Sequence, residues 1–476
     1  MPFVGRRREL DELAHHLDVV RRGQRADRGV CLALRGRRRV GKSRLVTEFA
    51  VRSGAPTVYF QAARGADPGA ELALFAEAVA TSDLPGAALV AGVVPTSLTA
   101  ALTLLATALP DDVPSVVVLD EVPWLLEAFP GGAGELQRVW DTRLAAKPVL
   151  LLLLGGDLAM MEGLARPDQP FHGRATEMVL DPLSPRDVGR MTGLTGADAV
   201  DAWLVTGGSP LVAQEWRPGT DVETFLAESF ARSTSALVVS GSRVLDGEFP
   251  GSGVAHQVLD AIGGRGERTF SGIQRAARGG PLNAATLTAT LQMLSAKRVV
   301  TADEPLSLRA ATKDRRWRVA DPALRFWLAF VEDALPDVDR GRPDLALARV
   351  RRGLAAWRGR AVEPFVREAL ERLLPDEAWP QVRRVGGWWP RSNTPEIDLV
   401  GADARPAGAV GFVGLVKWRS EGPVSAAEVG HLATTATAVP GVGAGTPLVA
   451  VCPAGSVPGT ALARTWTADD LLAAWP

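Results

Sequence analysis

Residues 36–43 read Gly-Arg-Arg-Arg-Val-Gly-Lys-Ser and match the pattern GxxxxGK[ST]. They follow an apolar run at residues 29–35 that predicts a strand, and they precede a helical pattern at residues 44–51. A phosphate-binding loop needs this context, because the backbone N–H groups and the positive end of the helix then face one anion. The alternative, a glycine-rich turn with a chance lysine, is much the weaker interpretation.

The side chains of this loop predict a nucleotide with magnesium. Lys42 is of the type that reaches the β and γ phosphate oxygens, and the Ser43 hydroxyl is of the type that binds Mg²⁺. We therefore expect ATP and Mg²⁺ as cofactors. The residues expected to contact the nucleotide here are Gly36, Arg37, Arg38, Arg39, Val40, Gly41, Lys42, Ser43 and Arg44.

A second apolar run, at residues 115–119, ends in Asp120 and Glu121. We expect Asp120 to hold the magnesium together with Ser43, and Glu121 to polarise the attacking water as a general base. The alternative, two acids at the start of a helix, is less favoured with the loop upstream. The pair predicts hydrolysis as well as binding. Asp157, after the run at residues 150–154, is a weaker candidate for sensing the γ-phosphate, and a turn-forming role is favoured there.

The composition excludes several classes of protein. The chain has 476 residues, of which 46% are hydrophobic and 22% charged, so disorder is excluded and roughly three domains are expected. Its 53 basic and 54 acidic residues exclude nucleic-acid binding by bulk charge. Cys31 and Cys452 lie far apart in apolar runs, which excludes a disulfide framework and a zinc site. No apolar run approaches the roughly 20 residues that span a bilayer, so we expect a cytoplasmic protein without a membrane partner.

Alternating helical and strand patterns divide the chain. Apolar runs at residues 56–60, 115–119, 149–154 and 177–180 alternate with helical stretches, which predicts an α/β core with a parallel sheet over residues 1–183. Residues 184–240 read as a helical lid. Residues 241–335 contain three helical patterns and a hairpin, the content of a winged helix. Residues 336–352 are expected to connect this part to a last α/β domain, residues 353–476, with the order helix, hairpin, helix, strand.

Five segments together carry a resemblance to a known family. They are residues 3–10, the loop at 37–42, Asp120 with Glu121, residues 171–176, and the Gly-Gly-Ser-Pro turn at 207–210. In this order they resemble the archaeal-type ATPases, a STAND branch of the AAA+ class of P-loop NTPases with a winged helix and a C-terminal nuclease-like domain. The resemblance implies nucleotide contacts at Val4, Gly5, Arg6 and Pro210. It also implies that Arg174 is a catalytic arginine. Without it, Arg6 reads as a charged helix start, Pro210 as a helix break and Arg174 as half of a salt bridge.

The last domain resembles the PD-(D/E)XK nucleases at Glu363, Asp398 and Lys417. In that family an Asp and a Glu on adjacent strands hold the metal, and the Lys orients the water. Here Leu415, or Val416 if the register slips, stands at the Glu position, and neither can bind a metal. Glu396 shares a strand face with Asp398 and is the one substitute available. We expect an inactive site kept as a binding platform, in an α/β fold of the restriction-endonuclease type.

The sequence thus predicts an ATP-hydrolysing molecular switch. What the switch acts on stays open: DNA, through the winged helix and the nuclease-like domain, a partner protein, or a second copy of the chain. One alternative is an ATP-regulated, metal-dependent DNA nuclease. The other is a regulator that holds ATP or ADP without hydrolysing it and acts through a protein partner or self-association. The wing, whose cations are Arg309, Lys313, Arg315 and Arg316, is a candidate for DNA contact, and a module that only packs against protein is an equal alternative. Trp388, Trp389 and Trp418 are candidates for base stacking, with core packing as the alternative.

Overall fold

The computed structural model describes residues 3–23, 28–156, 160, 161, 163, 166, 169, 171–249, 252–277, 280–309 and 312–475. The chain forms two compact units, Met1–Pro182 and Leu183–Pro476, here called unit 1 and unit 2. Asp157 lies outside the described residues. Within the described part of the chain, no helix is long and apolar enough to cross a membrane.

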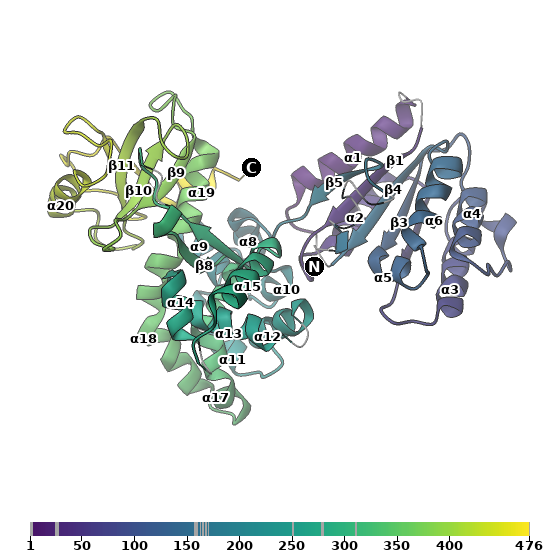
Figure 1. Cartoon of the computed structure of the whole chain (residues 1–476), viewed down its shortest axis with the longest axis horizontal. Helices are drawn as coiled ribbons and strands as arrows, with labels where there is room; N and C mark the ends of the chain where they lie inside the picture. Colours follow the sequence, from purple (N-terminus) through teal and green to yellow (C-terminus); the bar gives the residue numbers. More distant parts are fainter. Residues whose placement is uncertain are drawn as a thin grey trace. The chain divides into compact units, whose positions relative to one another are not determined.

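Unit 1 is built on a parallel sheet of five strands in the order β2-β3-β4-β1-β5 (Figure 1). The strands follow the apolar runs of the sequence, since parallel strands are buried on both faces. Their bounds are β1 Val30–Arg35, β2 Thr57–Gln61, β3 Ser115–Asp120, β4 Val149–Gly155 and β5 Ala175–Val179.

Helices cover both faces of this sheet. Alternate residues of each strand point to opposite faces, so Leu32 packs with α1 and α2, whereas Cys31 belongs to the core shared with α3 to α6. The helix after β1 therefore lies on one face, and the helices after β2 and β3 lie on the other. Their bounds are α1 Arg7–Arg22, α2 Lys42–Ser53, α3 Pro68–Ala80, α4 Leu98–Ala108, α5 Val122–Glu127 and α6 Gly132–Val139.

Unit 2 begins with helices and continues into a small sheet. A three-stranded antiparallel sheet of order β6-β8-β7 follows and accompanies three helices, α13 to α15; we call residues 253–319 the three-helix segment. The bounds are α8 Pro185–Thr192, α9 Gly196–Thr206, α10 Pro210–Ala213, α11 Val222–Phe230, α12 Ala236–Glu248, α13 Gly253–Ile262, β6 Arg268–Thr269, α14 Phe270–Ala276, α15 Ala284–Ala296, β7 Val300–Asp303 and β8 Arg316–Val319.

The C-terminal part contains a second five-stranded sheet, of order β13-β12-β11-β10-β9 (Figure 1). One face packs on α19 and α21 and the other on α20. The elements are α16 Pro322–Phe326, α17 Leu335–Asp339, α18 Pro343–Ala361, α19 Glu363–Leu373, β9 Arg384–Trp388, β10 Ile397–Ala402, β11 Val410–Val416, α20 Ala426–Ala436, β12 Leu448–Val451, β13 Arg464–Trp466 and α21 Ala468–Leu472.

One hydrophobic core runs through helices α8 to α12, the three-helix segment and the α19 face of the second sheet. Buried polar bonds join the same parts: Asp201 of α9 accepts from Trp418 Nε1 at 2.9 Å and from Arg358 Nη1 at 2.7 Å. The parts that the sequence divides into lid, winged helix and last domain therefore pack as one compact unit.

The structure adds elements that the sequence did not predict in this region. Residues 336–352, which we expected to be a connector, contain the end of α17 and the first half of α18, whose Ala346, Val350 and Trp357 are buried. The small and basic residues between these positions hide the helical period. The last domain also has three elements that we did not predict, β9, β13 and α21; their sequences are short and give little periodicity.

Candidate functional site

The phosphate-binding loop joins the end of β1 to the start of α2, at the point where the strand order changes direction: β2, β3 and β4 lie on one side of β1 and β5 lies on the other. In open α/β sheets this switch point, at the carboxyl ends of the strands, is where ligands bind. Both motif glycines occupy positions where a side chain would clash or would strain the backbone. A Cβ on Gly36 would lie 2.6 Å from the Leu180 carbonyl oxygen, and Gly41 has a φ of +98°.

Lys42 is buried under this loop. Its Nζ donates to the carbonyl oxygens of Gly36 at 2.7 Å and Arg37 at 3.2 Å, so the ammonium group is held across the loop. The other predicted contacts, Arg38, Arg39, Val40, Ser43 and Arg44, lie on the same loop or in the first turn of α2.

Asp120, at the end of β3, is buried beside Ser43. Ser43 Oγ donates to Asp120 Oδ2 at 2.6 Å, and the Glu121 backbone N–H donates to Oδ1 at 2.9 Å. The two residues that we assigned to magnesium therefore meet, although they stand far apart in the sequence. Hydroxyl and carboxylate oxygens are the ligands that Mg²⁺ prefers, so this pair fits the metal.

Tyr59 is a site residue that sequence reasoning missed. Its hydroxyl donates to Asp120 Oδ2 from the neighbouring strand β2. Burial, and then the hydrogen bond to Asp120, raise the pKa of the Tyr59 hydroxyl above its ordinary value. Tyr59 is the one tyrosine of the chain, and this rarity could have drawn attention to it. The sequence alone does not show that β2 lies beside β3.

Glu121 turns away from Asp120 toward the end of β4. Its backbone is left-handed, with φ +54°, and its Oε2 accepts from the Gly156 N–H at 3.4 Å. A Cβ on Gly156 would lie 3.1 Å from Glu121 Oε1 and 3.0 Å from Arg38 Cγ. The carboxylate and the Arg38 side chain therefore both flank the end of β4, at the same edge of the sheet as the loop.

Arg6 braces the loop from the N-terminal segment. It is buried, with Nη2 donating to the Val40 carbonyl at 3.0 Å and Nη1 bonding Glu9 at 3.0 Å. Its guanidinium group thus has protein partners where the resemblance implied a nucleotide contact. Val4 and Gly5 stand directly before it, ahead of α1.

Arg174 belongs to unit 1 and Pro210 to unit 2. Arg174 pairs with both carboxylate oxygens of Asp141, at 2.8 Å each, which is the salt-bridge alternative. This pairing lowers the pKa of Asp141. Pro210 begins α10 in unit 2, after the Gly207 turn; a Cβ on Gly207 would lie 2.2 Å from the Ala323 nitrogen, so close packing on α16 explains that glycine.

The nuclease-like residues gather around an arginine. Arg367 is buried, pairs with Glu363 Oε2 at 2.9 Å, and donates to the Asp398 carbonyl at 3.1 Å and 3.2 Å. Asp398 Oδ2 in turn accepts from the Val416 N–H at 2.8 Å. Burial raises the pKa of Glu363 to about 8, with Arg367 opposing the shift. A guanidinium group therefore supplies the positive charge beside these acids.

The remaining nuclease-like positions lie near Asp398: burial raises the pKa of its carboxyl overall, while the charge of Lys417 lowers this pKa and the charge of Glu396 raises it. Glu396 bonds Arg316 of β8 at 2.5 Å, and Lys417 is half-buried at the end of β11. Leu415 is buried in the apolar core that includes α20. Among the residues that the structure describes, no group of three or more His, Cys, Asp or Glu could hold a metal ion.

Several candidates for nucleic-acid contact prove to be structural. Trp388, Trp389 and Trp418 are buried, so core packing is their role. Arg316 is also buried and stacks 4.2 Å from the Trp389 ring centroid. Its inclusion among the available cations of the wing was wrong.

Comparisons with known proteins give one family match and several similar solved structures. Residues 327–429 match the family DUF234, described as archaea bacterial proteins of unknown function. The similar solved structures include the Walker-type ATPase PABY2304 of Pyrococcus abyssi, with 18% identity over 68% of this chain and 96% of that one, and a TM-score of 0.47. The ORC2 protein of Aeropyrum pernix, in ADPNP-ADP complexes, shows 15% identity over 73% and 96%, with a TM-score of 0.44.

A STAND protein of Pyrococcus horikoshii with a tetratricopeptide repeat sensor, PH0952, shows 14% identity over 78% of this chain and 50% of that one, with a TM-score of 0.29. No curated protein sequence matches the chain. Because these TM-scores lie below 0.5, the fold assignment rests on the strand order, the loop and the switch point described above. The chain has the parallel-sheet α/β fold of a P-loop NTPase, with a separate C-terminal part that contains its own sheet.

Proposed function

We propose that this protein binds ATP with Mg²⁺ at the carboxyl edge of the unit 1 sheet and hydrolyses it to ADP and phosphate. The observation that carries the proposal is the 2.6 Å contact between Ser43 Oγ and Asp120 Oδ2. It brings the last residue of the loop motif to the acid that ends β3, at the switch point of the sheet.

Each residue has a role that its chemistry supports. The loop N–H groups and the α2 N-terminus bind phosphate oxygens, and Lys42 neutralises their charge. Ser43 and Asp120 hold the magnesium, which when bound offsets charge on the phosphates. Glu121, beside Gly156, accepts a proton from the attacking water. Arg6 orders the loop through Val40, and Val4, Gly5 and Pro210 remain proposed nucleotide contacts.

The larger architecture extends the proposal to a switch of the STAND type. Residues 184–240 act as a lid, residues 241–335 form a winged helix, and residues 353–476 form a degenerate nuclease-like domain. The shared core of unit 2 supports a concerted response of these parts, since they pack as one body. Arg367 beside Glu363 supports the absence of nuclease activity, because its guanidinium group already pairs with a carboxylate that would have to bind the metal.

Steady-state ATP hydrolysis with Mg²⁺ tests the proposal, comparing the wild-type chain with Lys42→Ala. We expect the variant to lose at least about 100-fold in rate, the cost typical of removing a positioned charge-stabilising group. Lys147→Ala is the matched control, because Lys147 precedes β4 at the opposite end of the sheet and pairs with Asp111 at the surface. It should hydrolyse ATP at the wild-type rate.

The same assay separates the alternatives. A rate that DNA stimulates supports coupling to nucleic acid, and a rate that DNA leaves unchanged favours a protein-partnered switch. Tight nucleotide binding without turnover in the wild-type chain would replace the ATPase with a nucleotide-bound regulator. Metal-dependent DNA cleavage that is lost in Asp398→Ala would establish the nuclease instead.

A second proposed function is nucleic-acid binding by the three-helix segment. A groove of about 480 Å³ runs along it, and its polar lining fits a phosphate backbone. The polar residues are Thr269, Ser271, Thr288, Gln292, Lys313 and Arg315. Of these cations Arg315 already bonds Glu304, at 3.0 Å from its Nε, whereas Lys313 is exposed.

Fluorescence anisotropy with a labelled DNA duplex at several salt concentrations tests this function. Lys313→Ala should weaken binding and reduce the salt slope by about one. Arg352→Ala, an exposed arginine on α18, should bind as the wild-type chain does. Equal affinity of all three proteins would remove the groove from the interface.

A further inference from the structure

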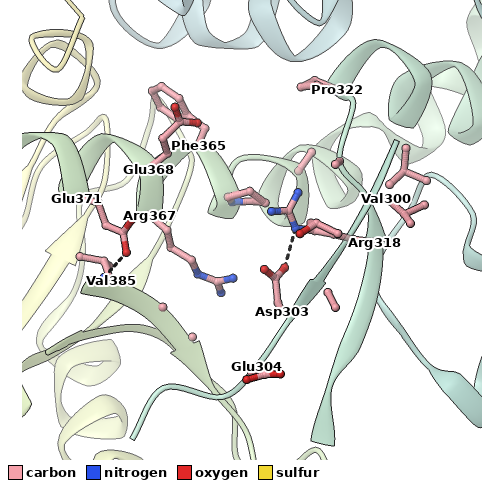
Figure 2. Close-up of a pocket in the computed structure, with 18 of the residues that line it drawn as sticks. Val300, Asp303, Glu304, Arg318, Pro322, Phe365, Arg367, Glu368, Glu371 and Val385 are labelled. Carbon is pink, nitrogen blue, oxygen red and sulfur yellow. Dashed lines mark hydrogen bonds and ion pairs between the residues drawn. The ribbon is translucent and has the colours of Figure 1, made fainter. Parts of the chain in front are cut away.

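A large cavity lies in unit 2, between the small sheet of the three-helix segment and the α19–β9 side of the C-terminal part (Figure 2). Its volume is about 1160 Å³. In Figure 2 the Arg367 side chain extends from α19 toward Asp303 on β7, and Arg318 on β8 bonds Asp303 from the other side. None of Glu363, Glu396, Asp398 and Lys417 lines the cavity, but Arg367 does, and it is the residue that the cavity shares with the nuclease-like cluster.

Twelve of the 29 residues that line the cavity are charged. Seven arginines face five carboxylates, and no lysine or histidine is among the lining residues. The arginines are Arg298, Arg318, Arg325, Arg367, Arg383, Arg384 and Arg405, and the acids are Asp303, Glu304, Glu368, Glu371 and Asp403. The formal excess is two positive charges.

Three of the five acids are already bonded to groups outside the cavity. Glu304 accepts from Arg315, Glu368 from Arg372, and Asp403 from the backbone N–H groups of Gly408 and Ala409. Within the cavity only Asp303 and Glu371 pair with lining arginines, Arg318 at 2.6 Å and Arg384 at 3.9 Å. The lining thus carries an excess of positive charge, part of which Glu267 and Glu363, outside the lining, offset at Arg325 and Arg367.

Four of the arginines, in contrast, have donors that bond nothing within the described part of the chain. Arg325 and Arg367 are buried, and their bonds to described residues come from Nε and Nη2. Arg318 bonds through Nε alone, and the exposed Arg383 makes no side-chain bond among the described residues. Burial, and next the nearby Arg318, lower the pKa of Arg325 to about 10. The cations thus crowd one another around an open space.

We propose that this cavity binds a phosphate-bearing anion, through the free guanidinium nitrogens of Arg318, Arg325, Arg367 and Arg383. The planar fork of arginine matches two oxygens of a phosphate group, and several forks converge here. The volume exceeds what a single inorganic phosphate fills and suits a ligand of nucleotide size or longer. The same chemistry is offered by a free polyphosphate or nucleotide and by a nucleic-acid backbone. The site does not depend on the phosphate-binding loop.

Isothermal titration of the full chain carrying Lys42→Ala tests the site, because that change weakens phosphate binding at the loop. The probes are inorganic pyrophosphate, tripolyphosphate and a short DNA oligonucleotide at low ionic strength. Arg383→Ala, added to this background, should weaken binding about tenfold, the value of one charged hydrogen bond. Arg383 is exposed and makes no side-chain bond, so folding should persist, and an unchanged thermal midpoint verifies it.

The affinity of Arg383→Lys for the probes should lie between that of the Lys42→Ala background and that of Arg383→Ala. Lysine keeps the positive charge but lacks the planar fork of arginine. Arg352→Ala, an exposed arginine outside the cavity lining, is the matched control and should bind like the background. Binding of pyrophosphate or tripolyphosphate identifies a free phosphate ligand, and binding of the oligonucleotide alone identifies a nucleic-acid backbone.

Three outcomes overturn the proposal. The first is that no probe binds. The second is that all probes bind Arg383→Ala as tightly as the background. The third is oligonucleotide binding that Lys313→Ala abolishes and Arg383→Ala leaves intact, which would assign it to the three-helix groove.

Discussion

Asp120 in unit 1 belongs to a metal-site motif, and so do Glu363 and Asp398 in unit 2. The two sites differ in the charge of the groups that bond these acids. Asp120 receives three hydrogen bonds, all from neutral donors: the hydroxyls of Ser43 and Tyr59 and the N–H of Glu121. No ion pair to Asp120 is found within the described residues. Glu363 instead pairs with Arg367, which also bonds the Asp398 backbone.

This difference determines which of the two sites can still bind a metal ion. A buried carboxylate with neutral donors alone keeps its negative charge uncompensated, so a bound Mg²⁺ gains attraction there. A carboxylate that already pairs with a buried arginine offers much less, because the metal would have to displace or repel that cation. Motif residues are therefore informative about function only together with the charges that surround them.

The largest effect is expected from Glu121→Gln. If Glu121 is the general base, the ATP hydrolysis rate should fall by about 10²- to 10⁴-fold while nucleotide affinity stays within a few-fold. Glu127→Gln, an exposed glutamate at the end of α5, is the control and should be fully active. Single-turnover hydrolysis and fluorescent-nucleotide binding measure the two quantities. A variant as active as the wild-type chain would show that Glu121 is not the base.

Leu415→Glu tests whether restoring the missing acid restores a metal site. Leu415 is buried among apolar side chains, so a carboxylate there should lower the free energy of unfolding by about 3 kcal/mol. Leu415→Met, which conserves volume, should cost less than about 1.5 kcal/mol. Urea unfolding measures both. We expect no metal-dependent DNA cleavage, and cleavage by Leu415→Glu would contradict the contrast between the two regions.

Tyr59→Phe removes one of the neutral donors from Asp120. A hydrogen bond to a charged group contributes about 1.5–3 kcal/mol, so the free energy of unfolding should fall by the lower end of that range. The difference from the wild-type chain should shrink with Mg²⁺ and ADP bound, because the metal then compensates the carboxylate. Thr47→Ala removes an exposed hydroxyl that bonds the Ser43 carbonyl on the same helix and should change stability by less than about 0.5 kcal/mol.

If Mg²⁺ with ADP leaves the Tyr59→Phe difference unchanged, then Asp120 does not receive the metal. That result would remove the distinction between the two regions, since both acids would then serve structure alone.

Glu363→Gln should alter the pH dependence of stability. The Glu363 pKa is about 8 in the folded chain and 4.5 without the fold's influence, so between these values the folded state keeps a proton that the unfolded state releases. The stabilisation is therefore complete below the lower value and is lost as the pH rises toward the higher one. The variant should remove a slope of up to about 1.4 kcal/mol per pH unit from the free energy of unfolding.

Urea unfolding between pH 5 and about 8 measures this slope. Glu368→Gln on the same helix is the control, because Glu368 is exposed and pairs with Arg372 at the surface. Identical slopes for the wild-type chain and Glu363→Gln would show that the pKa of the Glu363 carboxyl has its ordinary value. The raising of this pKa by burial would then be cancelled by the lowering that Arg367 causes.

Much of unit 1 could be predicted from local pattern. The apolar runs become β1 to β5, and the motif from Gly36 to Ser43 lies between β1 and α2 as expected. Local signals suffice there because each strand is a continuous buried run and the loop chemistry is contiguous. Residues 336–352 show the opposite case, since the buried face of α18 is made of small and widely spaced residues that carry a weak period.

The sequence by itself determined the phosphate-binding loop, the acids that end β3 and the absence of an acid at Leu415, because these depend on residue type and on short spacing. The tertiary structure alone decided that Tyr59 meets Asp120, that Arg367 joins Glu363 and Asp398, and that seven arginines line one cavity. Such contacts join residues from separate elements, and the order of strands and the packing of helices that bring them together are set by the whole core.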